Sequence, residues 1–293
     1  MRRLSLKALC AACAALCLSM LATAGAAGTA RLAAQPQRIV SLNLCTDQIV
    51  LQLVPRERIA ALSWLSQKPE SAALHQQAQG LRTVRGSAEE VLALQPDLVL
   101  VGTATTRHTT RLLQSFGVRT LALPGADSFA QVKAQIRTVA AAVGEAARGE
   151  AVVAVMEAQA RAIATAHNAP ANTARQGTRP VAIAYWAGGR SAGRDTLYED
   201  ILTTAGYANG ATQAGMKGYA ALPLERLVAS SPNVIVTNDY KRGAPTLGNR
   251  LLKHPALLGT GAQEVRLPSR ITVCGGPWNI DAAALLAREG SQP

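Results

Sequence analysis

Apolar residues along this chain fall into short continuous runs separated by segments of helical periodicity. The runs at residues 98–101 and 181–186 are apolar at consecutive positions, and those at 38–42 and 58–62 are mostly apolar after an initial arginine, so both faces of each would be buried. Such runs are typical of parallel strands covered by helices on both sides. The alternation of strands and helices therefore predicts an α/β fold with parallel-sheet cores.

One helix-to-strand unit occurs twice. In residues 87–101 a short helix begins with acidic residues, stops before Pro96 and leads into a buried strand. Residues 222–237 repeat this order at a constant offset, which aligns Glu89 with Glu225 and Pro96 with Pro232. A repeated unit of this kind predicts two lobes of similar build.

The segment between these copies has a different pattern. From 128 to 168 the chain is rich in helix-forming residues, and the strongest turn signals are Gly144 and Gly149. We expect one long helix here, or two nearly collinear ones. The predicted organisation is an N-terminal α/β lobe over 38–127, a bridging helix over 128–168 and a C-terminal α/β lobe over 178–293. In the first lobe, Thr46 and Asp47 are predicted to cap the helix that follows the first strand.

The first residues have the features of a secretion signal. A basic stretch over 1–7 precedes an apolar stretch over 8–22, and small residues follow at possible cleavage sites after Ala24 or Ala26. We therefore predict a cleaved signal peptide over 1–26 and a periplasmic protein. Loss of the signal removes three basic residues, which leaves 27 of the 30 against 18 acidic ones. This balance favours anionic partners, and the scattered basic residues argue against nucleic acid.

Two cysteines remain after the predicted cleavage. Cys45 follows the first predicted strand and Cys274 follows the last. In an oxidising compartment two cysteines most simply form a disulfide, although free thiols or joint ligation of a soft metal are alternatives. A disulfide here would cross between the lobes and limit their opening.

Candidate ligand contacts come from the loops after the strands, because ligands of open parallel sheets bind beyond the carboxyl ends of the strands. Aromatic residues make up only 3% of the chain, yet several lie at predicted strand ends or in neighbouring loops. The candidates are Trp64, Trp186, Tyr219, Tyr240 and Trp278. Arg107 and Arg190 occupy comparable loops and would suit an anionic or carboxylate-bearing ligand.

An exported serine hydrolase is the alternative function. Residues 189–193 fit the G-x-S-x-G pattern around Ser191, and Asp239 and His254 follow in the order that a hydrolase would use. Extra glycine before the motif and the lack of a glycine-rich oxyanion segment count against this interpretation. The four histidines are scattered without metal-ligand spacing, and no phosphate-binding or dinucleotide motif appears, so we expect no metal site and no cofactor.

Several of these segments resemble one known family. They are residues 38–42, residues 89–101 with their turn into a strand at 95–99, residues 115–118, the long helical segment and residues 224–236. In these motifs the chain resembles the solute-binding proteins of ABC importers that carry ferric siderophores, haem and cobalamin, with two lobes bridged by a rigid helix.

The resemblance implies a monomeric, non-enzymatic protein that captures a metal chelate between its lobes and delivers it to an ABC permease dimer in the inner membrane. A ferric siderophore is the favoured ligand and a corrinoid such as cobalamin is next. Haem ranks lower, because no histidine or tyrosine is placed as a clear axial ligand. A receptor for a bare metal ion is a third possibility.

The resemblance also implies roles for individual residues. Glu89 and Glu225 fall where glutamates of the family dock onto arginines of the permease, although a carboxylate in a first helical turn is also stabilised by the helix dipole alone. Trp64, Trp186, Tyr219 and Trp278 match the places of ligand-binding aromatics. Cys45 and the segment 274–278 depart from the family pattern.

Overall fold

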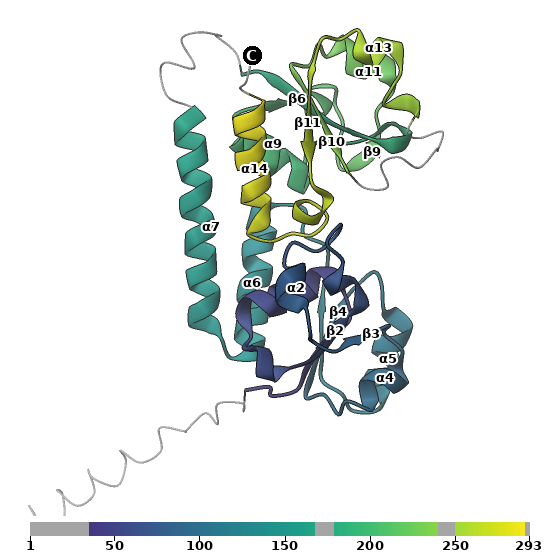
Figure 1. Cartoon of the computed structure of the whole chain (residues 1–293), viewed down its shortest axis with the longest axis vertical. Coiled ribbons are helices and arrows are strands. Elements are labelled where there is room, and N and C mark those ends of the chain that lie inside the picture. Colours follow the sequence, from purple (N-terminus) through teal and green to yellow (C-terminus); the bar gives the residue numbers. More distant parts are fainter. Residues whose placement is uncertain (1–34, 168–178, 240–249, 291–293) are drawn as a thin grey trace, which may run out of the picture. The chain divides into compact units, whose positions relative to one another are not determined.

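The computed structural model describes residues 35–167, 179–239 and 250–290. The predicted signal peptide over 1–26 lies outside the described residues. Residues from Pro36 onward form one compact unit, and within it the strands form two sheets (Figure 1). We call the elements from β1 to β5 the N-terminal lobe and those from β6 to α14 the C-terminal lobe. Among the described residues, no helix is both long and apolar enough to cross a bilayer.

The N-terminal lobe contains a five-stranded sheet in the order β3-β2-β1-β4-β5, and every neighbouring pair is parallel. Its strands are β1 (Ile39–Ser41), β2 (Ile59–Ser63), β3 (Thr83–Val84), β4 (Leu98–Gly102) and β5 (Thr120–Leu123). The helices between them are α2 (Leu44–Leu53), η1 (Arg56–Arg58), η2 (Trp64–Gln67), α3 (His75–Ala78), α4 (Ala88–Leu92) and α5 (Arg107–Ser115).

The start of α2 differs from the sequence expectation. Asn43, and not Thr46 or Asp47, is the N-cap residue, and its side chain accepts a hydrogen bond from the N–H of Cys45. The helix begins earlier than expected because the chain turns immediately after β1. Asp47 consequently lies inside the helix and is fully buried.

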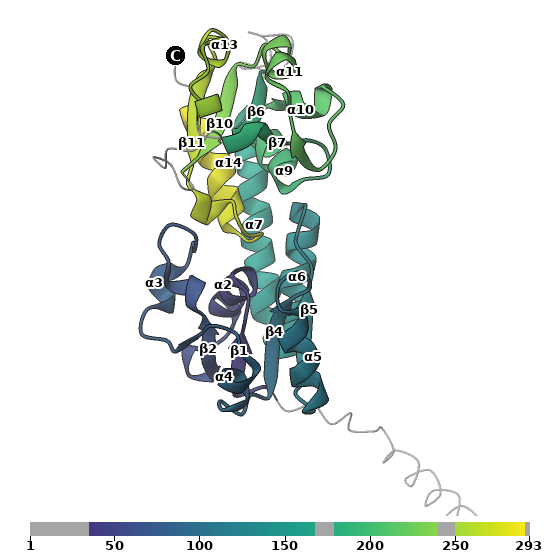
Figure 2. The same cartoon turned by 90° about the vertical axis from the view of Figure 1, so that its right-hand side faces the viewer.

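The segment between the lobes forms two helices, α6 (Phe129–Val143) and α7 (Ala146–His167), which lie side by side (Figure 1, Figure 2). Ion pairs join Lys133 to Glu157 and Arg137 to Glu150, so the two helices are antiparallel. The expectation of collinear helices is therefore wrong. The chain reverses at Gly144, which ends α6 with a positive φ of 75°.

Each end of α6 is fastened to a different lobe. At its start, the N–H of Phe129 donates to Asp200 of the C-terminal lobe at 2.6 Å. At its end, the side chain of Arg58 donates to the carbonyl of Val143 and pairs with Glu145 at 2.5 Å. The longer helix α7 then returns to pack against α9 and α14. The segment predicted as one bridging helix over 128–168 is thus the antiparallel pair α6 and α7.

The C-terminal lobe has a parallel core extended by antiparallel strands. Its order is β11-β10-β6-β7-β9, and β8 also pairs with β6. Pairs among β6, β8, β10 and β11 are parallel, whereas β7 pairs antiparallel with β6 and β9. The strands are β6 (Val181–Trp186), β7 (Arg190–Ala192), β8 (Ala208–Asn209), β9 (Tyr219–Ala221), β10 (Val234–Asn238) and β11 (Gln263–Leu267). The helices are η3 (Ala187–Gly189), α9 (Leu197–Thr204), α10 (Gly210–Gln213), α11 (Leu224–Ala229), α13 (Pro255–Leu258), η4 (Ser269–Ile271) and α14 (Trp278–Glu289).

The repeated unit of the sequence is also repeated in the backbone. Gln95 and Ser231, which precede the two aligned prolines, both have positive φ, at 47° and 43°. The next polar residue then binds the start of the neighbouring strand: Asp97 accepts from the N–H groups of Gln37 and Arg38, and Asn233 accepts from Val181. The prediction of two lobes with similar parallel-sheet cores is confirmed.

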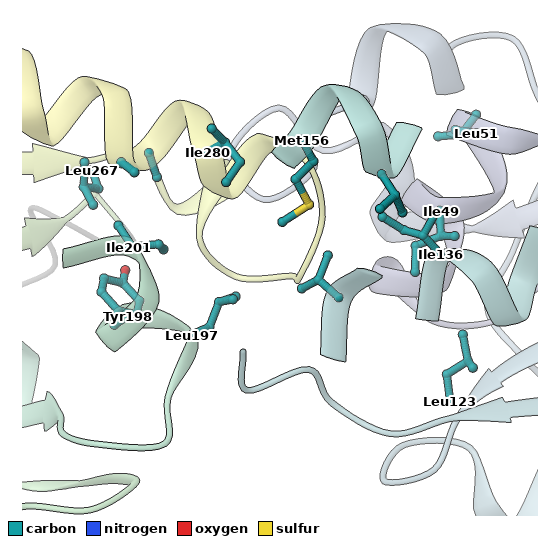
Figure 3. Packing of buried hydrophobic residues seen from close by; sticks show 14 of the residues in the cluster. Ile49, Leu51, Leu123, Ile136, Met156, Leu197, Tyr198, Ile201, Leu267 and Ile280 are labelled. Carbon is teal, nitrogen blue, oxygen red and sulfur yellow. The ribbon is translucent and has the colours of Figure 1, made fainter. Parts of the chain in front are cut away.

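Both lobes contribute to one large cluster of buried apolar side chains. Ile49 of α2, Ile136 of α6, Met156 of α7 and Ile280 of α14 all belong to it (Figure 3). Because α6 and α7 each bury an apolar stripe in this cluster, they form part of the core and are not an exposed linker.

Candidate functional site

Trp64 is the most accessible aromatic side chain at the carboxyl end of the N-terminal sheet. It follows β2 directly and opens η2, and 43% of its surface is exposed. Two cations approach the indole: Lys68 Nζ lies 5.7 Å and the Arg85 guanidinium 5.9 Å from a ring centroid. A partly exposed ring with cations around it is suited to a flat ligand that carries negative charge.

A buried carboxylate, Asp47, holds the residue that precedes this tryptophan. Asp47 accepts hydrogen bonds from both donors of Ser63, the residue before Trp64: the N–H at 3.2 Å from Oδ1, and the hydroxyl at Oδ2. Burial raises the pKa of Asp47 to about 7, although hydrogen bonds from the Ser41 and Ser63 hydroxyls oppose this effect. Asp47 thus links α2 to the ends of β1 and β2.

An open pocket of about 450 Å³ lies where β4 and β5 meet the first turns of α5. Arg107 and Arg111 line it from one face of α5, together with Thr103 and Thr110. The Nε of Arg107 donates to the carbonyl of Thr103 at 3.1 Å, which orients the guanidinium. No carboxylate pairs with either arginine among the described residues. The pocket can therefore offer two positive charges to an anionic group.

Arg107 was predicted from its place in the loop, whereas Arg111 was not. The missed signal was their spacing of four residues, which places both side chains on one face of a helix.

In the C-terminal lobe, three aromatic rings gather at the end of β6. The ring of Trp186 packs edge-on against Tyr198 of α9, with centroids 4.7 Å apart, and its centroid lies 6.3 Å from that of Tyr219 on β9. Trp186 and Tyr219 were predicted, and the structure brings them together. Tyr198 was missed, because the sequence does not show that α9 folds back beneath β6.

The hydroxyl groups of these tyrosines are largely removed from water. Burial, followed by the charge of Asp127, raises the pKa of Tyr219 to about 12. Burial also raises the pKa of Tyr198 well above its usual value. A tyrosine hydroxyl is neutral at physiological pH even at its ordinary pKa, so the cluster presents uncharged rings, with 42% of Tyr219 exposed.

Arg190 lies beside this cluster on β7. It is opposite Trp186 in the antiparallel β6–β7 pair, and its side chain is exposed. Two of the predicted ligand contacts, Trp186 and Arg190, thus lie at the same end of this sheet. Tyr240 lies outside the described residues.

Trp278 is placed differently from the prediction. Only 5% of it is exposed, and its indole N–H donates to the carbonyl of Cys274 at 2.8 Å. It belongs to a buried cluster with Leu44 and Ala72 of the N-terminal lobe. The prediction that Trp278 contacts a ligand is thus not supported, because the side chain is enclosed where the two lobes meet.

A disulfide joins Cys45 to Cys274 in the same cluster, with their Cα atoms 5.1 Å apart. The bond spans 229 residues and connects the first turn of α2 with the segment before α14. The lobes are therefore linked covalently at this point as well as through α6 and α7.

The comparisons with known proteins agree with this architecture. A family model described as "Periplasmic binding protein" matches residues 39–264. The chain belongs to this family. Members of this class are the solute-binding proteins of ABC importers, as the sequence resemblance implied. None of the curated protein sequences compared with the chain matches it.

Several solved structures are similar in fold to this periplasmic binding protein. The periplasmic haem-binding protein RhuT from Roseiflexus sp. RS-1, in its apo form, is 27% identical with a TM-score of 0.69, over 87% of this chain and 99% of that one. A periplasmic haem-binding protein from Pseudomonas aeruginosa is 28% identical with a TM-score of 0.68, over 87% and 92%. CeuE from Helicobacter pylori with Ni(II) bound, at 19% identity and a TM-score of 0.66 over 88% and 84%, shows the fold alone.

The two glutamates singled out in this periplasmic binding protein occupy matching positions. Glu89 is the second residue of α4 and Glu225 the second residue of α11, and both side chains are exposed. Hydrogen bonds from its own backbone N–H and from Ser87 lower the pKa of Glu89. Each lobe thus presents a carboxylate at the start of the helix in its repeated unit.

The hydrolase motif lacks the geometry of a catalytic site. Ser191 is fully buried on β7, and its hydroxyl donates to the carbonyl of Ala184 at 2.6 Å. Asp239 accepts from the N–H of Ser269, and His254 caps α13 by accepting from Ala256. A nucleophile must be accessible and bonded to its base, so this arrangement does not favour the alternative. Among the described residues there is also no group of three or more His, Cys, Asp or Glu that could hold a metal ion.

Proposed function

We propose that this periplasmic binding protein captures a flat, anionic metal chelate and delivers it to an ABC permease, with haem as the first candidate ligand. The observation that carries the proposal is the exposed Trp64 ring with Lys68 and Arg85 beside it. Conjugated rings stack on tryptophan, and the cations would meet the negative charge of the chelate.

The pocket lined by Arg107 and Arg111 lies at the same end of the N-terminal sheet as Trp64, namely the carboxyl ends of the strands. Trp64 follows β2, while Thr103 and Arg107 follow β4, and only β1 separates these strands. Neighbouring strands are about 4.8 Å apart, so the two sites are separated by roughly 10 Å across the sheet. A single ligand with a conjugated ring and peripheral carboxylates could contact both.

The ligand order differs from the one expected from the sequence. Haem carries two carboxylates on a flat ring, and two relatives at 27% and 28% identity are described as haem-binding. A corrinoid whose side chains are amides offers less negative charge to these arginines. An anionic ferric siderophore is the second candidate, because its iron is already fully coordinated and the cations near Trp64 are Lys and Arg, which are not iron ligands.

The ligand is tested by titrating the purified protein with haem, a ferric catecholate siderophore and cyanocobalamin, following tryptophan quenching and the visible spectrum. We expect tight haem binding, at least tenfold weakened by Trp64→Ala. Arg111→Ala should weaken it as well, whereas Arg119→Ala, an exposed arginine that precedes β5 at the opposite end of the sheet, should not. Absence of quenching by every chelate would rule the proposal out.

We further propose that Glu89 and Glu225 contact the permease. Their exposure and matching places in the two lobes support this role. A Glu89→Ala/Glu225→Ala protein should bind ligand normally but fail to support uptake by cells that carry the permease. Glu70→Ala, at another exposed glutamate, is the control and should support normal uptake. Undiminished uptake by the double variant would contradict the docking role.

A further inference from the structure

Ser63 has an unusual set of hydrogen bonds for its position. It is the N-cap residue of η2, where a serine hydroxyl normally accepts from a backbone N–H of the helix, but no such capping bond forms. Its hydroxyl and its own N–H both donate to Asp47 instead. The residue that immediately precedes Trp64 is therefore held at two points by one carboxylate.

Burial of the Asp47 side chain is energetically unfavourable. The side chain is fully inaccessible, and no basic side chain pairs with it among the described residues. Burial of a carboxylate is unfavourable unless hydrogen bonds compensate for the lost water, and here hydroxyl and N–H donors supply them. An apolar residue would fill this place in the core at lower cost, so the carboxylate needs an explanation beyond packing.

Among the described residues, no aromatic ring packs on the half-exposed side chain of Trp64. Its cationic neighbours, Lys68 and Arg85, are exposed, and such contacts contribute only about 0.5–1 kcal/mol. By contrast, the ring of Trp186 is packed against Tyr198. The backbone at Ser63, which directly precedes Trp64 and is held at two points, is the firmest support that the hydrogen bonds supply near this ring.

We propose that Asp47 is a positioning residue for Trp64: by holding Ser63 at two points, it fixes the exposed indole in the orientation that receives the chelate. The inference rests on the proposed function, in which Trp64 contacts the ligand. It assigns to a buried residue of α2 a part in ligand affinity.

The test compares two buried serines of the same short segment. Ser63→Ala removes the hydroxyl that donates to Asp47, whereas Ser66→Ala removes a buried hydroxyl that has no hydrogen-bond partner. Ser63→Ala should weaken haem binding about 3- to 10-fold, Ser66→Ala should leave it unchanged, and Ser63→Thr, which keeps a hydroxyl, should restore it. Equal losses in Ser63→Ala and Ser66→Ala would overturn the inference.

A double-mutant cycle separates positioning from general damage. In a Trp64→Ala background, Ser63→Ala or Asp47→Asn should cause no further loss of haem affinity. An additive loss would mean that Asp47 acts on the fold and not through Trp64.

A ligand-free measurement distinguishes failure of this inference from failure of the proposed function. The emission of Trp64, obtained as the difference between the parent protein and its Trp64→Phe variant, should shift in Ser63→Ala but not in Ser66→Ala. If this shift occurs while Trp64→Ala leaves haem affinity unchanged, then positioning stands and the proposed ligand contact falls. If no shift occurs, the positioning role is wrong.

Discussion

The aromatic residues at the ends of the two sheets are supported in different ways. In the N-terminal lobe, Trp64 is partly exposed, and the residue before it is hydrogen-bonded to the buried carboxyl group of Asp47. In the C-terminal lobe, Trp186 packs against Tyr198 and lies near Tyr219, so that rings support one another. The first arrangement depends on an ionisable group and the second on apolar contact.

The difference follows from the topology of the sheets. The N-terminal sheet is entirely parallel, so the residues at its carboxyl end come from loops after the strands. The C-terminal sheet adds the antiparallel strands β7 and β9, which place Arg190 and Tyr219 beside β6. Trp186 therefore has ring neighbours from both α9 and β9, whereas the residue before Trp64 is held by hydrogen bonds to Asp47.

The largest expected effect comes from removing the disulfide between the lobes. Replacement of both cysteines by serine (Cys45→Ser/Cys274→Ser) should lower the free energy of unfolding by about 2–5 kcal/mol, because the disulfide closes a very long loop. Urea denaturation measures this loss. Reductant should destabilise the parent protein by a similar amount and leave the double variant unaffected. If reductant left the free energy of unfolding of the parent protein unchanged, the disulfide would not contribute to its stability.

A second expected effect concerns Asp47 and the dependence of protein stability on pH. Burial raises the pKa of Asp47 from 3.8 to about 7, so the folded protein binds a proton there that the unfolded chain has released. This group therefore makes the protein less stable as the pH rises from about 4 to about 7, by up to roughly 4 kcal/mol.

Asp47→Asn should remove that contribution, and the measurement is the difference between the two proteins in urea midpoint at each pH. The C-terminal ring cluster has no comparable titration in this range, because the pKa values of Tyr198 and Tyr219 are raised to alkaline pH. Tyr198→Phe serves as the control and should leave the pH profile unchanged. Parallel profiles for the parent and Asp47→Asn would contradict the prediction.

A smaller expected effect comes from the repeated unit, in which equivalent substitutions in the two lobes can be compared by their loss of stability. Asp97→Ala removes an acceptor for two N–H groups, and Asn233→Ala removes an acceptor for one. The expected losses are about 1–2 kcal/mol for the first and about 1 kcal/mol or less for the second. Thermal unfolding of both variants would show whether the order is correct, and a reversed order would mean that the C-terminal unit is the more strongly held.

The smallest effect should come from the strained residues before the prolines. Gln95→Gly and Ser231→Gly place glycine at positive φ, which side chains with a Cβ adopt at a cost of about 1–2 kcal/mol. After the entropy cost of glycine, each change should stabilise the protein by about 0.5 kcal/mol. Similar gains in urea midpoint are expected in both lobes, and destabilisation by either variant would show that its side chain makes a favourable contact.

Much of the architecture could be predicted because it depends on local patterns. Continuous apolar runs indicated the parallel strands, and the aligned Glu89 and Glu225 units indicated two similar lobes. The reversal at Gly144 could not be predicted with the same ease, because the apolar periodicity of α6 and α7 continues on both sides of it. That turn is stabilised by contacts between the helices, such as the Lys133–Glu157 pair, which no local pattern reveals.

The site was predicted less completely for a related reason. Trp64 and Arg107 were placed at the end of the sheet from their positions after a strand, and the structure has them there; their contact with a ligand stays a prediction. Trp278 also follows a loop, but that loop is drawn into the buried cluster around Cys45 and Cys274, which encloses the ring. The importance of Asp47 depends on its hydrogen bonds to a strand that lies sixteen residues away in the sequence.

The long span of the disulfide also bears on how the protein is made. A chain is synthesised from its N-terminus, so Cys45 exists as a thiol long before Cys274, 229 residues later, is available. The fold holds Cys45 beside its partner only when the first turn of α2 and the segment before α14 have come together. Loss of thiol reactivity at Cys45 is therefore a chemical mark of the assembled protein. The fraction of molecules alkylated at Cys45 by a reagent added during export would measure how many have not yet formed the disulfide.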